Sequence, residues 1–331
     1  MKNASKITCI AVGAAAVAAS VASLISITIT RTLVEEALDR KGSRLLKNRK
    51  SLISGSVKDS DAYRTAQEKA AKLTQTEMQQ IEITAHDGVS LIGHWYPCDG
   101  AERIIVAMHG WRSNWAWDFG TVTEFWREHK CSILYAEQRG QGASGGNYMG
   151  FGMIERYDCL DWVNWICENI PGSTPIYLAG ISMGASTVLM AADLPLPERV
   201  HGILADCGFT SAKAIWQHVT EDNLHLSYRR REKYVDHLCR RRIHCGAEEV
   251  STVKALSQTH IPVLFIHGTA DTFVPVEMTY ENYDACAGPK MIHIVEGANH
   301  GLSYFADPDG YKAVTLNFWG RFDGNGTHKE A

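Results

Sequence analysis

Short apolar runs alternate with helical patterns along most of the chain. Six such runs lie at residues 104–108, 133–135, 176–179, 203–205, 263–266 and 291–295. Nearly continuous apolar strands separated by helices are typical of a parallel sheet that is covered by helices on both faces. Ligands of such sheets bind at the carboxyl ends of the strands, so the loops after these runs are the expected place for chemistry.

The flanking patterns extend this α/β domain in both directions. The stretch "QIEITAHDGVSLIGHWYP" alternates apolar and polar residues around Asp87-Gly88, which predicts a β-hairpin. The stretch "MIERYDCLDWVNWICENI" has helical spacing, and "PDGYKAVTLNFWGRF" predicts a closing helix that begins near Pro308. We therefore place the folded domain at residues 79–322 and a polar tail at residues 323–331.

The N-terminus has a different pattern. Residues 7–30 contain no Lys, Arg, Asp or Glu, and about 20 apolar residues are enough to span a bilayer. The alternative is a cleaved signal peptide with Lys2 and Lys6 as its basic end. Because the run is long for a signal peptide, we expect residues 1–30 to be a tail and an uncleaved transmembrane helix. The polar, helix-prone residues 31–78 are interpreted as a juxtamembrane spacer.

Charge leaves the orientation of this anchor ambiguous. Two lysines precede it and seven Lys/Arg lie within residues 31–50, so the positive-inside rule places the domain in the cytoplasm. An N-terminal anchor with a basic start, however, usually exports the domain on its C-terminal side. The two interpretations conflict; we expect a single-pass membrane protein with an extracytoplasmic domain, and the cytoplasmic alternative stays open.

Composition excludes some classes of function. The 331 residues are 45% hydrophobic and 21% charged, with a net charge of -4, which is typical of a folded protein and gives no sign of a nucleic-acid binder. The nine cysteines are scattered, without a CxxC pair or a metal-type spacing. We therefore expect neither a metal nor a cofactor. Cys239 and Cys245 are close enough in sequence to pair in an oxidising compartment.

A candidate nucleophile lies in "IYLAGISMGASTVLMAADL", where a strand pattern, a Gly-x-Ser-x-Gly motif and a helix pattern succeed one another. The pentapeptide alone is also compatible with an ordinary turn. A serine between two glycines at a strand-to-helix bend, however, is the arrangement of a nucleophile elbow. Glycine tolerates the strained backbone, and the helix N-terminus favours a developing oxyanion. Ser182 is therefore the expected nucleophile.

A serine hydroxyl needs a base, and the base needs an acid that orients it. His300 follows the last apolar run in "EGANHGLSY", and Asp271 follows the run before it in "VLFIHGTADTFVP". Asp206, at the end of "ILAD", is the alternative acid. We expect Asp271, because serine, aspartate and histidine then occur in the order known for such elbows.

The remaining requirement is an oxyanion hole. The expected donors are the backbone N–H of Met183, directly after the nucleophile, and that of Trp111, in the loop "HGWRSN". We expect His109 to brace this loop. Trp115 and Trp117 are candidates for an apolar wall of the substrate pocket, and core packing is the alternative.

Taken together, these segments resemble those of α/β-hydrolases. The likeness is to small membrane-anchored bacterial members of the serine aminopeptidase and monoacylglycerol lipase-like branch. It rests on "HGWRSN", "EQRGQGASGG", "GISMGAS", "HGTADTFVP" and "GANHGLSY", which occur in the expected order. The resemblance implies a mostly parallel eight-stranded sheet with a helical cap, and hydrolysis of a carboxylic ester or another acyl bond through an acyl-enzyme. A peptidase on short peptides and a catalytically silent membrane-tethered scaffold are the alternatives.

The segment "EQRGQGASGG" departs from the family pattern at one position, because Glu137 stands where the family usually has Asp. It is rich in glycine but lacks the Gly-Lys-Ser/Thr ending of a P-loop. We therefore interpret it as a tight structural loop and not as a phosphate site.

A cap insertion is expected at residues 209–258. Within it, residues 225–245 carry seven Lys/Arg against two acids. One interpretation is a solvated helical surface. The other is that the triplets Arg229–Arg231 and Arg240–Arg242 contact anionic lipid headgroups or an acidic substrate. The expected partners are thus a small ester, lipid or peptide substrate and the membrane.

Overall fold

An eight-stranded sheet forms the centre of the protein. The computed structural model describes residues 21, 23–46 and 61–324, and the strand order of its sheet is β1-β2-β4-β3-β5-β6-β7-β8. Strand β2 runs antiparallel to β1 and β4, and the other neighbours are parallel. The strands are β1 (Gln79–Thr84), β2 (Ser90–Tyr96), β3 (Arg103–Met108), β4 (Cys131–Ala136), β5 (Ile176–Ile181), β6 (Val200–Asp206), β7 (Val263–Gly268) and β8 (Lys290–Val295). The predicted hairpin and all six predicted strands are confirmed.

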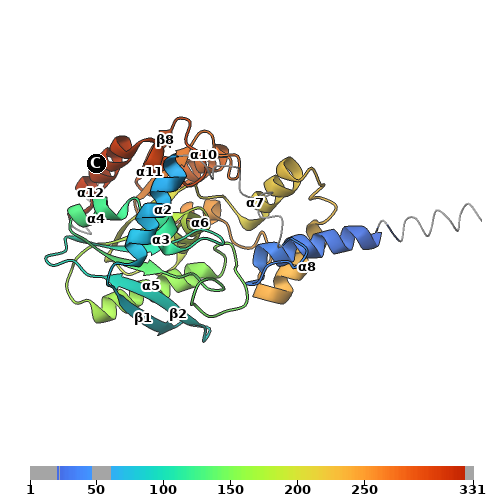
Figure 1. Ribbon diagram of the computed structural model, residues 1–331, viewed down its shortest axis with the longest axis horizontal. Coiled ribbons are helices and arrows are strands. Elements are labelled where there is room, and N and C mark those ends of the chain that lie inside the picture. The colour runs from blue at the N-terminus through green and yellow to red at the C-terminus, as the bar shows by residue number, and fades with distance from the viewer. Residues whose placement is uncertain (1–20, 22, 47–60, 325–331) are drawn as a thin grey trace, which may run out of the picture.

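Helices cover both faces of the sheet (Figure 1). One core contains side chains of α5 (Glu155–Asn169), α6 (Met183–Met190) and α9 (Thr252–Leu256). The core on the opposite face contains side chains of α2 (Asp61–Thr74), α3 (Trp115–Phe119), α4 (Thr123–Glu128) and α12 (Pro308–Phe322). The closing helix begins at Pro308, as predicted. Outside the segment between β6 and β7, the other helices named are η2 (Ala191–Asp193), α10 (Val276–Ala285) and α11 (Ser303–Ala306).

The segment between β6 and β7 is helical, in the region predicted as a cap. It contains α7 (Ala212–His218), the π-helix η3 (Val219–Asn223), α8 (Glu232–Ile243) and α9. A third apolar core joins α7 and α8 to Val34 and Leu38, which belong to a helix over residues 23–38. This N-terminal helix lies beside α8 and projects beyond it, away from the sheet (Figure 1).

The N-terminal helix corrects the interpretation of residues 31–78 as a spacer. Arg242 of α8 pairs with Asp39 at 2.6 Å, and the Arg40 guanidinium donates to the carbonyls of Gly142 and Ser144, each at 2.6 Å. The segment is therefore packed into the domain through residues such as Val34, Leu38 and Ser43, which are buried. The predicted membrane span lies largely outside the described residues, and no helix within the described ranges is both long and apolar enough to cross a membrane.

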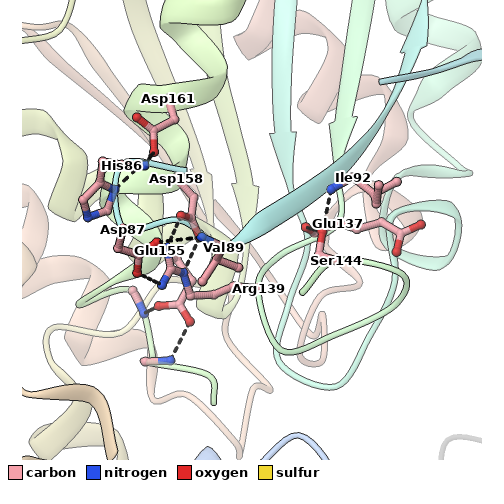
Figure 2. Close-up of polar contacts among 12 residues, drawn as sticks. His86, Asp87, Val89, Ile92, Glu137, Arg139, Ser144, Glu155, Asp158 and Asp161 are labelled. Atoms are coloured by element: carbon pink, nitrogen blue, oxygen red, sulfur yellow. Dashed lines mark hydrogen bonds and ion pairs between the residues drawn. The ribbon is translucent and has the colours of Figure 1, made fainter. Parts of the chain in front are cut away.

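The glycine-rich loop after β4 is held by ion pairs and hydrogen bonds, as Figure 2 shows. Buried Arg139 donates to Asp158 and Asp87, each at 2.6 Å, and Ser144 Oγ accepts from Ile92 N at 2.8 Å. Glu137 accepts from the Ala143 N–H and lies 2.7 Å from His94 Nε2. The arginine is thus fully engaged by carboxylates, as expected for a structural loop.

Half of the cap arginines have partners inside the protein. Arg231 donates to the Ser227 carbonyl at 2.6 Å, Arg240 pairs with Asp236 at 2.8 Å, and Arg242 pairs with Asp39. Arg240 is exposed although it is paired, so the exposed triplet members without an ion pair among the described residues are Arg229, Arg230 and Arg241. The hypothesis of lipid contact therefore rests on these three. Cys239 and Cys245 are both free thiols.

Candidate active site

Ser182 occupies the bend between β5 and α6. Its backbone has φ 57° and ψ -118°, a strained combination for a residue with a side chain, and such residues cluster at functional sites. The preceding strand ends at Ile181 and the helix begins at Met183, so the hydroxyl is presented at the carboxyl edge of the sheet. The sequence therefore produces the predicted elbow.

The two glycines of the motif are required by close backbone contacts. A Cβ at Gly184 would lie 1.8 Å from the carbonyl oxygen of Met108, at the end of β3. A Cβ at Gly180 would lie 2.3 Å from the backbone of Gly184. Any side chain at either position would collide with main-chain atoms, so only glycine permits this packing of α6 against the sheet.

Ser182, His300 and Asp271 are joined by hydrogen bonds. Ser182 Oγ lies 2.9 Å from His300 Nε2, and His300 Nδ1 lies 2.6 Å from Asp271 Oδ2. The other carboxylate oxygen of Asp271 accepts the N–H groups of Phe273 and Val274, each at 2.9 Å. The serine hydroxyl therefore donates to a histidine whose opposite N–H is oriented by a buried carboxylate, the geometry of an activated nucleophile.

The electrostatics of these residues agree with that geometry. Burial opposes ionisation of Asp271, but the charge of His300 and hydrogen bonds from His267 and His300 hold the pKa of Asp271 below its usual range. Burial likewise favours neutral His300, yet the Asp271 carboxylate raises the pKa of His300 above its ordinary value. The pair thus favours a carboxylate that stabilises an imidazolium when a proton arrives.

Asp206 has a separate structural role. Its side chain is buried and accepts the Ser303 hydroxyl at 2.8 Å. Burial raises the pKa of Asp206 to about 6, the opposite direction from that of Asp271. The structure therefore brings Asp271, and not the alternative acid, against His300.

His267 is a buried residue that the sequence motifs did not single out. Its Nε2 lies 2.9 Å from the Val274 carbonyl and 3.2 Å from Asp271 Oδ2, while Nδ1 lies 2.6 Å from Thr279 Oγ1. An Nε2–H directed at the carbonyl also faces the carboxylate, so His267 helps to fix Asp271. Its position at the end of β7, four residues before Asp271, is the signal that marks it in the sequence.

The loop after β3 passes directly beside the elbow. A Cβ at Gly110 would lie 3.4 Å from Ser182 Cβ. Asp118, a half-buried residue that was not predicted, accepts the Gly110 N–H and the Ser113 hydroxyl, each at 2.6 Å. His109 accepts the Gln138 N–H at its Nε2, 3.1 Å away, which is the bracing role expected for it. Asp118 therefore fixes the loop that carries Trp111.

The two predicted oxyanion donors lie on opposite sides of the close approach between Gly110 and Ser182. Trp111 follows Gly110 in the loop, and Met183 begins α6. No group in the described part of the chain accepts a hydrogen bond from either backbone N–H. Both amides are therefore free to donate to an oxygen placed at the elbow.

The N-terminal helix holds the same loop from outside. The indole N–H of Trp111 donates to the Ala37 carbonyl at 2.9 Å. The neighbouring Arg112, with φ 52°, donates to the carbonyls of Glu36 at 2.7 Å and Asp39 at 2.8 Å. These carbonyls lie at the C-terminal end of the helix, where they lack helical partners, so a guanidinium is well placed there.

The candidate pocket residues Trp115 and Trp117 have different surroundings. A cleft of about 1250 Å³ contains Ser182 and His300, and Trp117 lines it. Trp115 is buried beneath the cleft, with its ring 4.4 Å from His94 and 5.3 Å from Tyr135. The pocket assignment of Trp115 is therefore corrected to core packing, whereas Trp117 keeps it.

One cluster of potential metal ligands coincides with this site. The ligand atoms of Cys207, Asp271 and His300 lie within 4.8 Å of one another. Burial, however, raises the pKa of the Cys207 thiol well above its ordinary value, and a thiol must lose its proton to bind a metal. The hydrogen bonds from Ser182 through His300 to Asp271 also use the facing atoms of these ligands, so the set fits a metal poorly.

Comparisons with known proteins agree with the fold. A sequence model described as the alpha/beta hydrolase family matches residues 105–314. The chain is 28% identical over 197 residues to the uncharacterized protein YqkD of Bacillus subtilis, a match that covers 56% of this chain and 61% of YqkD. It is 24% identical over 249 residues to the uncharacterized protein YfhR of Escherichia coli O157:H7, covering 72% of this chain and 80% of YfhR.

Solved structures show the same architecture. The Pyrococcus furiosus esterase Pf2001 superposes with a TM-score of 0.60 at 23% identity, over 76% of this chain and 96% of the esterase. The α/β hydrolase GrgF from Penicillium superposes with a TM-score of 0.57 at 19% identity, over 76% of this chain and all of GrgF. At such identities the likeness concerns the fold alone.

Replacing Arg112 by alanine is expected to loosen the loop and the N-terminal helix together. Hydrogen bonds to charged groups contribute about 1.5–3 kcal/mol, so local opening should become about tenfold more frequent or more. Hydrogen–deuterium exchange of residues 23–38 and 109–113 measures this. Arg127→Ala, which removes a guanidinium stacked over Tyr96, is the control and should leave both segments unchanged. Unchanged exchange in Arg112→Ala would show that the contact does not hold the loop.

Proposed function

The chain belongs to the alpha/beta hydrolase family, and on that premise we propose that it is a serine hydrolase that cleaves carboxylic esters through an acyl-enzyme on Ser182. The observation that carries the proposal is the continuous hydrogen-bonded series from Ser182 through His300 to Asp271. A scaffold protein has no need for these three side chains in register at the carboxyl edge of a sheet.

In the proposed reaction, His300 carries one proton from the Ser182 hydroxyl to the leaving alcohol. Ser182 Oγ attacks the ester carbonyl carbon while His300 Nε2 takes its proton, and Asp271 stabilises the imidazolium. The oxyanion accepts the N–H groups of Met183 and Trp111. His300 then donates the proton to the alcohol oxygen as the C–O bond breaks. Water attacks the acyl-enzyme with His300 as base, which releases the acid and restores the serine.

An ester is the favoured substrate among acyl compounds. The Pyrococcus furiosus protein of the same fold is named an esterase, which supports this choice. The narrower likeness to aminopeptidases and monoacylglycerol lipases remains a hypothesis about substrate, because one fold hosts many chemistries. A panel of p-nitrophenyl esters and aminoacyl anilides separates an esterase from a peptidase.

We further propose that residues 7–30 anchor the protein in a membrane. The described end of this segment carries exposed apolar side chains at Val21, Leu24, Ile25 and Ile27. They lie in or directly before the first turns of the N-terminal helix, and this helix projects beyond α8, which supports a role outside the folded core (Figure 1).

Phosphonylation by a fluorophosphonate probe, in which a serine oxygen displaces fluoride from phosphorus, is expected to require Ser182. Ser182→Ala should abolish labelling and lower kcat for p-nitrophenyl esters by about 10⁶-fold, because the nucleophile itself is lost. Ser257→Ala, at an exposed serine, is the control and should retain both. Labelling of Ser182→Ala, or hydrolysis of aminoacyl anilides without any hydrolysis of esters, would contradict the proposal.

The rate of ester hydrolysis should rise with pH as His300 loses its proton. Since the nearby carboxylate raises the pKa of His300, the midpoint of the acid limb of kcat/KM is expected above about 6.5, the ordinary histidine value. Asp206 also raises the pKa of His300, so Asp206→Asn should move the midpoint to lower pH and preserve the rate at high pH. A midpoint below 6.5 in the native protein would be inconsistent with this coupling.

The full chain is expected to remain in the membrane pellet after washing with alkaline carbonate, because a spanning apolar helix is not released by high pH. The same wash applied to a chain that begins at residue 21 serves as the control and should release it. Release of the full chain would rule out the anchor. Protease protection in sealed vesicles then assigns the side of the membrane.

A further inference from the structure

A second cavity lies between the N-terminal helix and the cap. It has a volume of about 140 Å³, and its walls include Val34 on the N-terminal helix, Ile215 on α7 and Val219 on η3. An apolar cavity of about 150 Å³ holds benzene, so this space takes roughly six carbon atoms. Its apolar walls therefore suit a short alkyl chain.

This cavity adjoins the cleft that contains Ser182. Trp111 and Phe273 line both spaces, as do Glu36 and Leu46. The Phe273 ring lies 5.1 Å from the His300 ring, and Trp111 is the residue whose backbone N–H is proposed to bind the oxyanion. A chain attached to a carbonyl at Ser182 would thus enter the cavity between these two aromatic residues.

Two polar groups in the walls have no partner within the described residues. Arg231 Nε and Trp216 Nε1 are buried, and neither has a hydrogen-bond acceptor in that part of the chain. Arg231 is 9% exposed, and its only side-chain bond within those residues is the one from Nη1 to the Ser227 carbonyl. No carboxylate of the described residues pairs with this guanidinium, although Arg240 and Arg242 of the same segment both have one.

Such an arrangement is costly unless a ligand completes it. A buried donor without an acceptor destabilises the folded state, and a buried charge without a counter-charge does so more strongly. The missing group is an acceptor, and beside a guanidinium a carboxylate is the best match in charge and geometry. Trp216 also lines the cavity, and its buried indole N–H is a second donor without an acceptor among the described residues.

We propose that the cavity binds the acyl chain of the substrate and that this chain ends in a carboxylate held by Arg231 and Trp216. The proposal rests on the proposed function and names its substrate class: monoesters of dicarboxylic acids with about six carbons. The acyl side is assigned because the alcohol leaves first and needs an open path, whereas a chain in the cavity stays bound through the acyl-enzyme stage. One wall is the N-terminal helix, outside residues 105–314 that the family model matches.

Matched esters test the terminal carboxylate. The mono-p-nitrophenyl esters of hexanedioic and octanedioic acid are compared with p-nitrophenyl hexanoate and octanoate in the full chain. We expect kcat/KM to be at least about tenfold higher for one of the carboxylate-bearing esters than for its plain counterpart, since a charge-assisted hydrogen bond contributes about 1.5–3 kcal/mol. Arg231→Met, which replaces the guanidinium by an apolar side chain of similar length, should abolish this preference, so that the ratio of the two kcat/KM values within the variant falls to about one.

A neighbouring arginine provides the control. Arg230→Met removes one exposed positive charge from the same segment and should keep the preference, so a general loss of attraction for anions is excluded. Trp216→Phe, which removes only the indole donor, should reduce the preference partly and covers the case in which Arg231→Met fails to fold. Two outcomes would overturn this proposal even if the probe still labels Ser182. One is a native protein without a preference for either carboxylate-bearing ester, and the other is an Arg230→Met variant that loses the preference as fully as Arg231→Met does. Failure of labelling and of all ester hydrolysis would instead overturn the proposed function and this inference with it.

Discussion

The close contact between the start of α6 and the end of β3 is the constraint on which the rest of the site depends. Only a residue without a side chain fits at Gly184, because its α-carbon packs against the Met108 carbonyl. The strand continues directly into the loop that contains Gly110 and Trp111. The nucleophile and this loop are therefore held together by main-chain packing, and the strained backbone of Ser182 is maintained by elements that cannot move apart.

Much of this arrangement could be predicted because it depends on patterns that are local in the sequence. Strands buried on both faces require nearly continuous apolar residues, and six of the eight strands were found in this way. Ser182, Asp271 and His300 follow β5, β7 and β8, whose carboxyl ends share one edge of the sheet. Parallel topology brings such residues together, so order along the chain was enough to identify them. The structure joins them by hydrogen bonds, and their catalytic role remains the proposal.

Other features depend on contacts that leave no pattern in the sequence. Trp115 and Trp117 are two residues apart in α3, so they face different directions, and spacing alone did not show which one reaches the cleft. The polar N-terminal segment is typical of a spacer, since much of its attachment uses main-chain carbonyls beside the apolar contacts of Val34 and Leu38. Those carbonyls belong to every residue, and only Arg112 and Trp111, far along the chain, reveal that they are bound. The cap arginines likewise form one basic run, although their partners differ from residue to residue.

The N-terminal helix has a mechanical consequence. This helix points away from the domain (Figure 1). At its C-terminal end, Arg112 donates to the carbonyls of Glu36 and Asp39, and the Asp39 carboxylate pairs with Arg242 of α8. Tension applied to the chain ahead of residue 23 would therefore reach the loop beside Ser182 and the cap helix before it reached any strand of the sheet. This loop and α8 both border the cavity between the N-terminal helix and the cap, so these walls would be the first described parts of the molecule to take up such a pull.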